Sequence, residues 1–335
     1  MAVAVRLGTR PLSTSTSECC TYLPWRVSLT PLRTCDAVSR GSNRNRVTPS
    51  RQLSLFALRC QDMNEPFHHK KSLGQHFLNS DIVPEWMCDA AAVTSGDTVV
   101  EIGPGTGALT TALLARGAVV HAIETDMRAI AVLEDTLAEV IAEKRLTLHQ
   151  LDARRLSLTE LGFLDHQFKI VSNIPYYLTG QLLRRCIEHP VQPSDLVFLV
   201  QKEVAKRAAA KLPPAPGAKG SLLALSLQAY GDVSIFKAVS RGHFTPAPEV
   251  DSAILAVRNI SRDYFTDMSE ATFFQAIRAG FANKRKQLQH NFKQTFGSAC
   301  TGAVFQSADL PATFRDEDIS LNEWQRIAAT IESCQ

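Results

Sequence analysis

The segment Asn173-Ile174-Pro175-Tyr176 combines residue types that could present a planar base to an electrophile. The exocyclic amine N6 of adenine is a weak nucleophile because its lone pair is delocalised into the ring. The Asn173 side-chain oxygen and the Pro175 carbonyl could accept its two N–H bonds, and proline fixes the local backbone so that this carbonyl is pre-aimed. Tyr176 could stack on the ring, which is worth about 1–3 kcal/mol per base. The pattern predicts a pocket that works by positioning and hydrogen bonding, although the bare string also suits an ordinary turn.

A glycine-rich turn, Gly103-Pro104-Gly105-Thr106-Gly107, lies some 70 residues earlier and is preceded by an acid, Glu101. Glycines allow a tight turn and let the backbone approach a ligand closely at the start of a helix. Alone, this is weak evidence, because dinucleotide-binding proteins use a similar pattern. Pyrophosphate binding favours G-x-G-x-x-G, whereas this chain has G-x-G-x-G. We therefore predict a nucleoside-type cofactor, with Gly103 and Gly105 beside it.

Two further acids follow predicted strands. Glu124 ends the second strand, where a carboxylate could accept hydrogen bonds from ribose hydroxyls, and Asp152 follows the third, where it could accept the N6 protons of an adenine. Each alone is equally compatible with a solvated loop carboxylate. Because ligands of such sheets bind outside the carboxyl ends of the strands, Glu101, Glu124 and Asp152 together favour one nucleoside site.

Alternating short apolar strands and helical stretches surround these motifs. This alternation predicts an α/β fold with a mainly parallel sheet covered by helices on both faces. The expected strands are 98–102, 119–123, 146–148, 169–172 and 196–200, with 233–239 and 252–257 as an antiparallel pair at one edge. The expected helices are 82–92, 108–115, 127–144 and 221–230, and after residue 263 only helices follow, at 270–295 and 319–332. We predict a leader at 1–62, a cofactor-binding domain at 63–260 and a small all-helical domain at 261–335.

The first 60 residues differ in charge from the rest of the chain. They contain nine arginines, no lysine and two acids, and are rich in serine and threonine, so they carry +7. Since the whole chain of 335 residues carries +3, the remainder carries −4. This composition predicts an organellar transit peptide, for a mitochondrion or a chloroplast, with a basic RNA-binding arm as the alternative.

With a net charge of −4, the body could bind RNA only through local basic patches. Lys284, Arg285 and Lys286 form such a run on an expected helix, and we predict that they contact phosphates rather than being merely a solvated helix face. No Cys-x-x-Cys pair occurs in the body, so no metal site is expected, and no apolar stretch is long enough to predict a membrane helix.

From about Lys70 onward, the sequence resembles the ribosomal RNA adenine dimethyltransferase family. The resemblance is carried by six segments: 73–78 (LGQHFL), 101–107 (EIGPGTG), 173–177 (NIPYY), 199–205 (LVQKEVA), 244–252 (FTPAPEVDS) and 281–286 (FANKRK). It implies a Rossmann-like methyltransferase sheet, S-adenosyl-L-methionine as cofactor, and two methyl groups on each of two adjacent adenines in the 3′-terminal hairpin loop of small-subunit rRNA. The implied partner is this rRNA or the pre-ribosomal small subunit, and a monomer that binds no membrane is expected.

The resemblance also implies roles for single residues. The cofactor contacts implied are His76, Leu78, Gly103, Glu124, Asp152 and Asn173. Position 76 is often Asn in the family, so the contacting atom of His76 is open. Tyr176 would lie against the target base, with Phe244 as a second wall and Tyr177 close by.

Three other functions stay open at this point. A non-catalytic assembly factor or mitochondrial transcription factor could share the fold, although intact Asn173 and Tyr176 argue against a pure loss of activity. A DNA adenine methyltransferase would share the Asn-Pro-Tyr chemistry, but the helical C-terminal part fits RNA dimethylases better. A large-subunit rRNA adenine methylase would differ only in its substrate.

Overall fold

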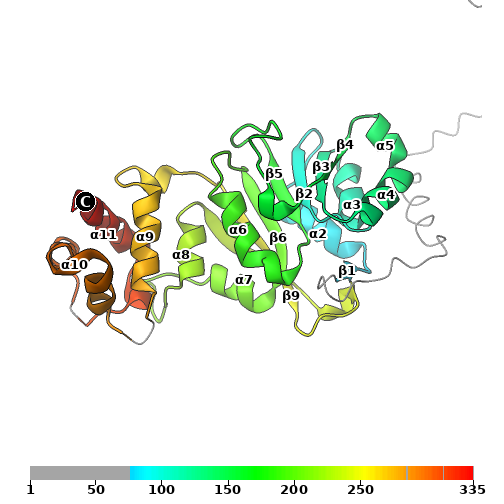
Figure 1. The fold of residues 1–335 in the computed structure, drawn as a ribbon. Helices are drawn as coiled ribbons and strands as arrows, with labels where there is room; N and C mark the ends of the chain where they lie inside the picture. Colours follow the sequence, from blue (N-terminus) through cyan, green and yellow to red (C-terminus); the bar gives the residue numbers. More distant parts are fainter. Residues whose placement is uncertain (1–75, 284–285, 312, 335) are drawn as a thin grey trace, which may run out of the picture. The chain divides into compact units, whose positions relative to one another are not determined.

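A computed structural model describes residues 76–283, 286–311 and 313–334. Its centre is a seven-stranded sheet with the order β4-β3-β2-β5-β6-β9-β7 (Figure 1). The strands are β2 (Thr98–Ile102), β3 (Val119–Glu124), β4 (Leu146–Gln150), β5 (Lys169–Ser172), β6 (Asp195–Gln201), β7 (Asp232–Val239) and β9 (Ser252–Arg258). The first five in sheet order are mutually parallel, β9 is antiparallel to β6, and β7 is antiparallel to β9. The predicted α/β sheet with an antiparallel edge pair is confirmed.

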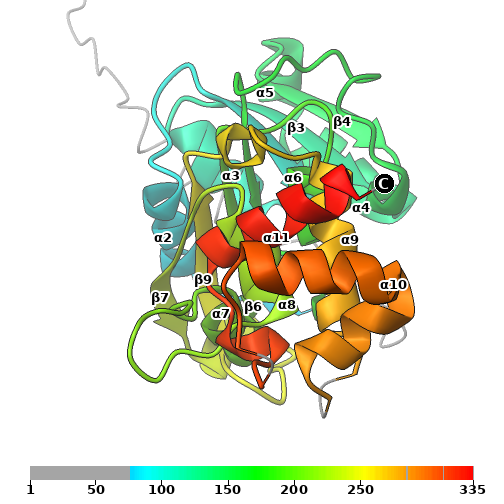
Figure 2. The same cartoon turned by 90° about the vertical axis from the view of Figure 1, so that its left-hand side faces the viewer.

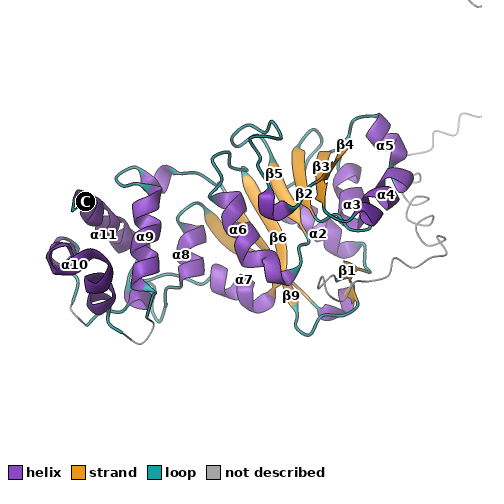
Figure 3. Cartoon of the chain, in the orientation of Figure 1, coloured by secondary structure: helices purple, strands orange, loops and turns teal. Residues whose placement is uncertain are grey.

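Helices cover both faces of this sheet (Figure 3). They are α2 (Ile82–Ala90), α3 (Ala108–Ala115), α4 (Met127–Thr136), α5 (Ala138–Ala142), α6 (Thr179–Ile187), α7 (Lys202–Ala208) and α8 (Leu222–Gln228). Successive strand residues point to opposite faces. Val197 and Leu199 of β6 therefore join one buried cluster with α2 and α3, whereas Leu196, Phe198 and Val200 join another with α6 and α8. Burial on both faces explains why the central strands are continuously apolar.

The helix predicted at 127–144 is interrupted in the structure. α4 ends at Thr136 and α5 begins at Ala138, with Leu137 at φ −119° and ψ 23° between them. The Thr136 hydroxyl donates to the Val132 carbonyl at 2.7 Å. Such a bond to the residue four positions back often bends a helix, and here it lies directly before the break between α4 and α5.

The C-terminal part contains α9 (Glu270–Gly280), α10 (Leu288–Ser307) and α11 (Leu321–Ser333), and α11 packs against both other helices (Figure 2). Their shared core includes the fully buried Trp324, Phe273 and Phe292. This core is continuous with that of the sheet, since the Tyr230 ring stacks on Phe274 with ring centroids 6.0 Å apart. The predicted division at residue 260 stays a prediction, and the leader at 1–62 lies outside the described residues.

The prediction of one continuous helix at 270–295 is also wrong, because the structure has two helices there. α9 ends at Gly280 and α10 begins only at Leu288. The Asn291 side chain donates to the Gly280 carbonyl at 2.6 Å and so satisfies the end of α9. A Cβ on Gly280 would come within 2.5 Å of the Trp324 ring, which requires glycine at this close approach. Lys286 therefore lies in the connection rather than on a helix, and Lys284 and Arg285 lie outside the described residues.

Two short strands, β1 (Phe77–Leu78) and β8 (Phe244–Thr245), pair antiparallel beside the main sheet. The pairing brings the segment before α2 next to the segment that leads into β9. Among the helices that the structure describes, none combines the length and apolar character needed to cross a bilayer.

Candidate active site

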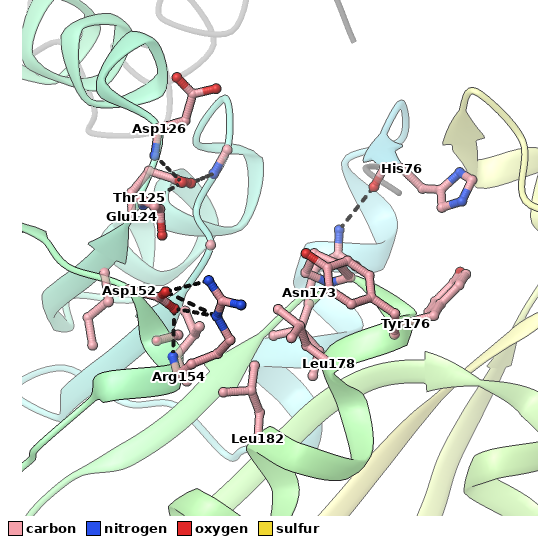
Figure 4. Close-up of a pocket in the computed structure, with 18 of the residues that line it drawn as sticks. His76, Glu124, Thr125, Asp126, Asp152, Arg154, Asn173, Tyr176, Leu178 and Leu182 are labelled. Carbon is pink, nitrogen blue, oxygen red and sulfur yellow. Dashed lines mark hydrogen bonds and ion pairs between the residues drawn. The ribbon is translucent and has the colours of Figure 1, made fainter. Parts of the chain in front are cut away.

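A cavity of about 620 Å³ opens at the carboxyl ends of β2, β3, β4 and β5 (Figure 4). In the sheet, β3 and β4 lie on one side of β2, whereas β5 and β6 lie on the other. Parallel sheets bind ligands where the strand order reverses in this way. The cavity is lined by His76, Ile102, Gly103, Gly105, Ile123, Glu124, Thr125, Asp126, Met127, Asp152, Ala153, Arg154, Asn173, Ile174, Pro175, Tyr176, Tyr177, Leu178 and Leu182. The sequence motifs around Gly103, Glu124, Asp152 and Asn173 therefore share one cavity.

The glycine turn forms a bare stretch of backbone in the cavity wall. Gly103 donates its N–H to the Ile123 carbonyl at 2.8 Å, which ties the turn after β2 to β3. Its φ is +70°, and a Cβ added here would meet no atom within 4 Å. Gly105 has φ +56°, and a Cβ there would come within 3.0 Å of the Phe77 ring. Gly103 thus leaves open space for a ligand, and Gly105 is required by its backbone conformation and its neighbour.

Glu124 is held in place by backbone amides. One carboxylate oxygen accepts from the N–H groups of Thr125 at 2.7 Å and Asp126 at 2.9 Å, and the other accepts from Gly105 at 3.4 Å. The residue is only 9% exposed. Three amide donors fix the carboxylate without neutralising its charge, so it remains a strong acceptor for hydroxyl groups.

Asp152 has a partner that the sequence did not suggest. The Arg154 guanidinium donates to both carboxylate oxygens, with an Nη2–Oδ2 distance of 2.7 Å and Nε distances of 3.1 and 3.0 Å. This side-chain hydrogen bond, supported by the Arg154 backbone N–H, holds the pKa of Asp152 below its usual range. Asp152 is therefore ionised at neutral pH, and a ligand amine at this end of the cavity would meet the guanidinium as well.

Glu101, the third acid of the predicted set, does not line the cavity. It is 1% exposed and accepts a 2.6 Å hydrogen bond from the Thr110 hydroxyl of α3. Burial raises the pKa of Glu101 to about 8. Since side chains alternate along β2, Ile102 lies on the cavity side and Glu101 points to the opposite face of the sheet. Its role is to link β2 to α3 beneath the glycine turn.

The opposite side of the cavity contains the Asn-Ile-Pro-Tyr segment. The Asn173 amide nitrogen donates to the His76 carbonyl at 3.5 Å, a long contact that leaves the amide oxygen for an amine donor. The Pro175 carbonyl already accepts the Leu178 N–H at 3.0 Å, so one of its two lone pairs is used. Ile174 lines the same cavity and adds a second backbone carbonyl at this turn.

Tyr176 begins the short 3-10 helix η3 (Tyr176–Leu178), and its ring stacks on His76 with centroids 5.5 Å apart at 27°. The Tyr176 hydroxyl shares a 2.6 Å hydrogen bond with Ser252, and His76 Nδ1 lies 2.8 Å from the Pro246 carbonyl. The neighbouring Tyr177 lines the cavity with 65% of its surface exposed.

Two predicted residues do not line the cavity. Leu78 and Phe244 face each other in the β1–β8 pair, and Phe244 is 3% exposed within the core cluster that includes Val239 and Ile254. Their predicted contacts with cofactor and base stay predictions.

Several lining residues were not predicted. Ile102, Ile123, Met127, Leu178 and Leu182 supply apolar wall, while Thr125, Asp126 and Arg154 supply polar wall. All but Met127 and Leu182 lie within two positions of a predicted residue. For Ile102, the alternation of side chains along the strand after Glu101 is a signal that could have found it. Nothing in the sequence pattern marks Ser252 or Pro246 as partners of the aromatic pair.

The comparisons with known proteins agree with this geometry. The model of the family described as ribosomal RNA adenine dimethylase matches residues 66–331. The chain is 37% identical over 283 residues to ribosomal RNA small subunit methyltransferase A of Dehalococcoides mccartyi (strain CBDB1), covering 82% of this chain and 92% of that protein. The chain belongs to the ribosomal RNA adenine dimethylase family. Ribosomal RNA small subunit methyltransferase A of Enterococcus faecalis (strain ATCC 700802 / V583) is 34% identical over 293 residues, which cover 85% of this chain and 96% of that protein.

Solved structures of the same fold include a dimethyladenosine transferase from Plasmodium falciparum, with a TM-score of 0.63, 24% identity, and coverage of 75% of this chain and 96% of that one. The 23S rRNA methyltransferase ErmE gives a TM-score of 0.57 at 19% identity, covering 76% of this chain and 99% of that one. These likenesses confirm the Rossmann-like methyltransferase sheet. Membership of the ribosomal RNA adenine dimethylase family confirms the prediction of a methyltransferase enzyme acting on rRNA adenine, and it implies the use of S-adenosylmethionine.

Proposed function

We propose that this ribosomal RNA adenine dimethylase transfers methyl groups from S-adenosyl-L-methionine to N6 of two adjacent adenines in the 3′-terminal hairpin loop of small-subunit rRNA. The observation that carries the proposal is the shared cavity, in which Asn173 and Tyr176 lie opposite Glu124 and Asp152 (Figure 4). One side offers anionic acceptors for a nucleoside, and the other offers an amide and an aromatic ring for a base.

The cofactor would be held by the strand ends. Glu124, fixed by three amides, suits the ribose hydroxyls, and Asp152 suits the amine of the cofactor's adenine. The bare Gly103 backbone follows β2, which lies between β3 and β5 in the sheet. Ile123 and Ala153 supply apolar contacts for the flat adenine ring. When bound, the cofactor supplies a methyl group on a positively charged sulfonium, which is an intrinsically reactive donor.

The chain's own contribution to methyl transfer is to position the amine. The Asn173 oxygen would accept one N–H of the target amine, and the Ile174 or Pro175 carbonyl would accept the other. Two such bonds favour a pyramidal amine with its lone pair directed along the cavity toward the cofactor side. Tyr176 stacks on the base, so the purine ring keeps one plane while the amine reacts.

We propose that the substrate is rRNA within a partly assembled small subunit, bound by a monomer. Hairpin-loop adenines are already unpaired, so splaying one into a pocket costs less than extracting it from a duplex. Lys284, Arg285 and Lys286 would contact phosphates. A body with a net charge of −4 can bind RNA only through such a local basic patch. A role in ribosome biogenesis follows from such a substrate.

We further propose an organellar location, in a mitochondrion or a chloroplast. The Arg-, Ser- and Thr-rich leader supports it, and the family match begins only at residue 66, after the leader. A fusion of residues 1–62 to a fluorescent protein should enter an organelle, and diffuse distribution of that fusion would overturn this proposal.

The enzymatic proposal is tested with purified protein and unmethylated small-subunit particles. We expect methyl transfer from labelled S-adenosylmethionine and N6,N6-dimethyladenine in the digested rRNA, at two adjacent positions. Large-subunit rRNA serves as the parallel substrate, because the fold is shared with a large-subunit methylase. Transfer to large-subunit rRNA alone would replace the substrate assignment.

A second role in assembly is compatible with the same fold. It is separated from catalysis by Asn173→Ala in cells that lack the wild-type chain. Normal subunit assembly with unmethylated rRNA would favour the binding role, whereas an assembly defect equal to that of the deletion would favour the enzymatic one.

A further inference from the structure

The Tyr176 hydroxyl forms a hydrogen bond with Ser252, which lies 76 positions further along the chain. Its oxygen lies 2.6 Å from the Ser252 hydroxyl oxygen. Ser252 is the first residue of β9 and is fully buried, with exposure of 0%. It pairs with Gln201 of β6 on one side and Val239 of β7 on the other. The anchor for the Tyr176 hydroxyl is therefore a rigid point inside the sheet.

The position of Tyr176 in the backbone makes such an anchor useful. The residue lies in a single 3-10 turn directly after Pro175. Proline fixes the backbone of this turn but leaves the two side-chain torsions of the tyrosine free. A base stacks well only on a ring that already has one orientation, because ordering a mobile side chain during binding costs free energy.

A second contact restrains the same ring. His76 stacks on Tyr176, and His76 Nδ1 is 2.8 Å from the Pro246 carbonyl. Pro246 directly follows β8 and Ser252 begins β9, so one short stretch of chain, residues 246–252, holds both aromatic rings. With one face of Tyr176 covered by His76, the base would stack on the other face.

The Tyr176 phenol is suited to positioning rather than to proton transfer. Burial raises its pKa above the ordinary value, and the hydrogen bond to Ser252 offsets only part of that effect. The phenol therefore stays neutral at physiological pH and cannot take the proton released by the methylated amine.

We propose that Ser252 is a positioning residue for methyl transfer: its hydroxyl fixes the plane of the Tyr176 ring and so aligns the target base with Asn173. Ser252 is not among the residues that line the cavity, so it would act only through Tyr176. This inference rests on the proposed function, since it assigns Tyr176 to the target base.

The test compares Ser252→Ala, Tyr176→Phe and the double variant in single-turnover methyl transfer to small-subunit particles at saturating S-adenosylmethionine. Each single variant should slow transfer about three- to tenfold, the factor that corresponds to the net contribution of one hydrogen bond. The double variant should be no slower than the slower single variant, because both changes break the same bond. The Kd of S-adenosylhomocysteine should stay within twofold of that of the wild type. Ser226→Ala, a buried serine of α8, is the matched control and should keep the wild-type rate.

If the wild type transfers methyl groups and Ser252→Ala transfers them equally fast, this inference is overturned and the proposed function stays intact. Multiplicative losses in the double variant, or equal weakening of cofactor binding, would also overturn it. No transfer by the wild type would overturn both. If Ser252→Ala does not fold, Tyr176→Phe decides: it keeps the ring and Ser252, and it must be slow with cofactor binding intact.

Discussion

The cofactor side and the base side of the cavity are restrained in different ways. On the cofactor side, Glu124 is held by the amides of Gly105, Thr125 and Asp126, and Asp152 by Arg154 two residues away. These restraints are mostly local in sequence. On the base side, His76, Tyr176 and Ser252 come from segments separated by 76 residues or more and are held by contacts across the fold. Substitutions on the cofactor side should therefore mainly change the affinity for the cofactor. Substitutions on the base side should mainly change the rate of methyl transfer.

The largest effect is expected for Asn173→Ala. The change would remove the acceptor that is proposed to orient the target amine, so the transfer rate should fall roughly 10²- to 10³-fold, as for loss of one preorganised polar group elsewhere. Since Asn173 would make only one contact among several with the cofactor, the Kd of S-adenosylhomocysteine should rise less than about tenfold. Rapid-quench transfer and calorimetry measure the two quantities. A Kd that changes as much as the rate would show that the two sides are not separable.

Glu124→Ala should produce the opposite pattern. Loss of charged acceptor groups for the ribose should weaken S-adenosylhomocysteine binding roughly 10- to 100-fold, while transfer at saturating cofactor changes little. Glu134→Ala, an exposed acid on α4, is the control and should bind as the wild type does. A slower rate at saturating cofactor would contradict the division of roles.

A pH effect is expected from Glu101, beneath the cofactor-side turn. Because its pKa is raised to about 8, the folded state binds more protons than the unfolded state between the ordinary carboxyl pKa and pH 8. The free energy of unfolding should therefore fall as pH rises through this window, by at most about 1.4 kcal/mol per pH unit. Glu101→Gln should flatten this dependence. Chemical denaturation at several pH values measures it, and parallel slopes for both proteins would count against a neutral Glu101.

The smallest effect is expected for Arg154→Leu. Its guanidinium occupies both oxygens of Asp152, which the adenine amine would also use. Removal of this competitor should tighten S-adenosylhomocysteine binding severalfold, by less than about a factor of ten. Asp152 stays ionised at neutral pH without Arg154, because an ordinary aspartate does so. Weaker binding would indicate instead that Arg154 orients Asp152.

Much of the cofactor side was readable from the sequence. The alternation of apolar strands with helices predicted the parallel sheet, and the acids at the strand ends placed Glu124 and Asp152 in one cavity. This worked because parallel strands bring their carboxyl ends to the same edge whatever their separation in sequence. The failures were local: Glu101 faces the other side of its strand, Leu137 interrupts a helix, and Gly280 ends another before the basic run.

The sequence by itself determined the order of elements and the residue types at the ends of the strands, because hydrophobic periodicity and turn chemistry act over a few neighbouring residues. Only the tertiary structure decided that Pro246 and Ser252 hold the His76–Tyr176 pair, that Glu101 is buried against α3, and that Arg154 covers Asp152. These contacts depend on the direction of single side chains after packing. No spacing in a single chain specifies that direction.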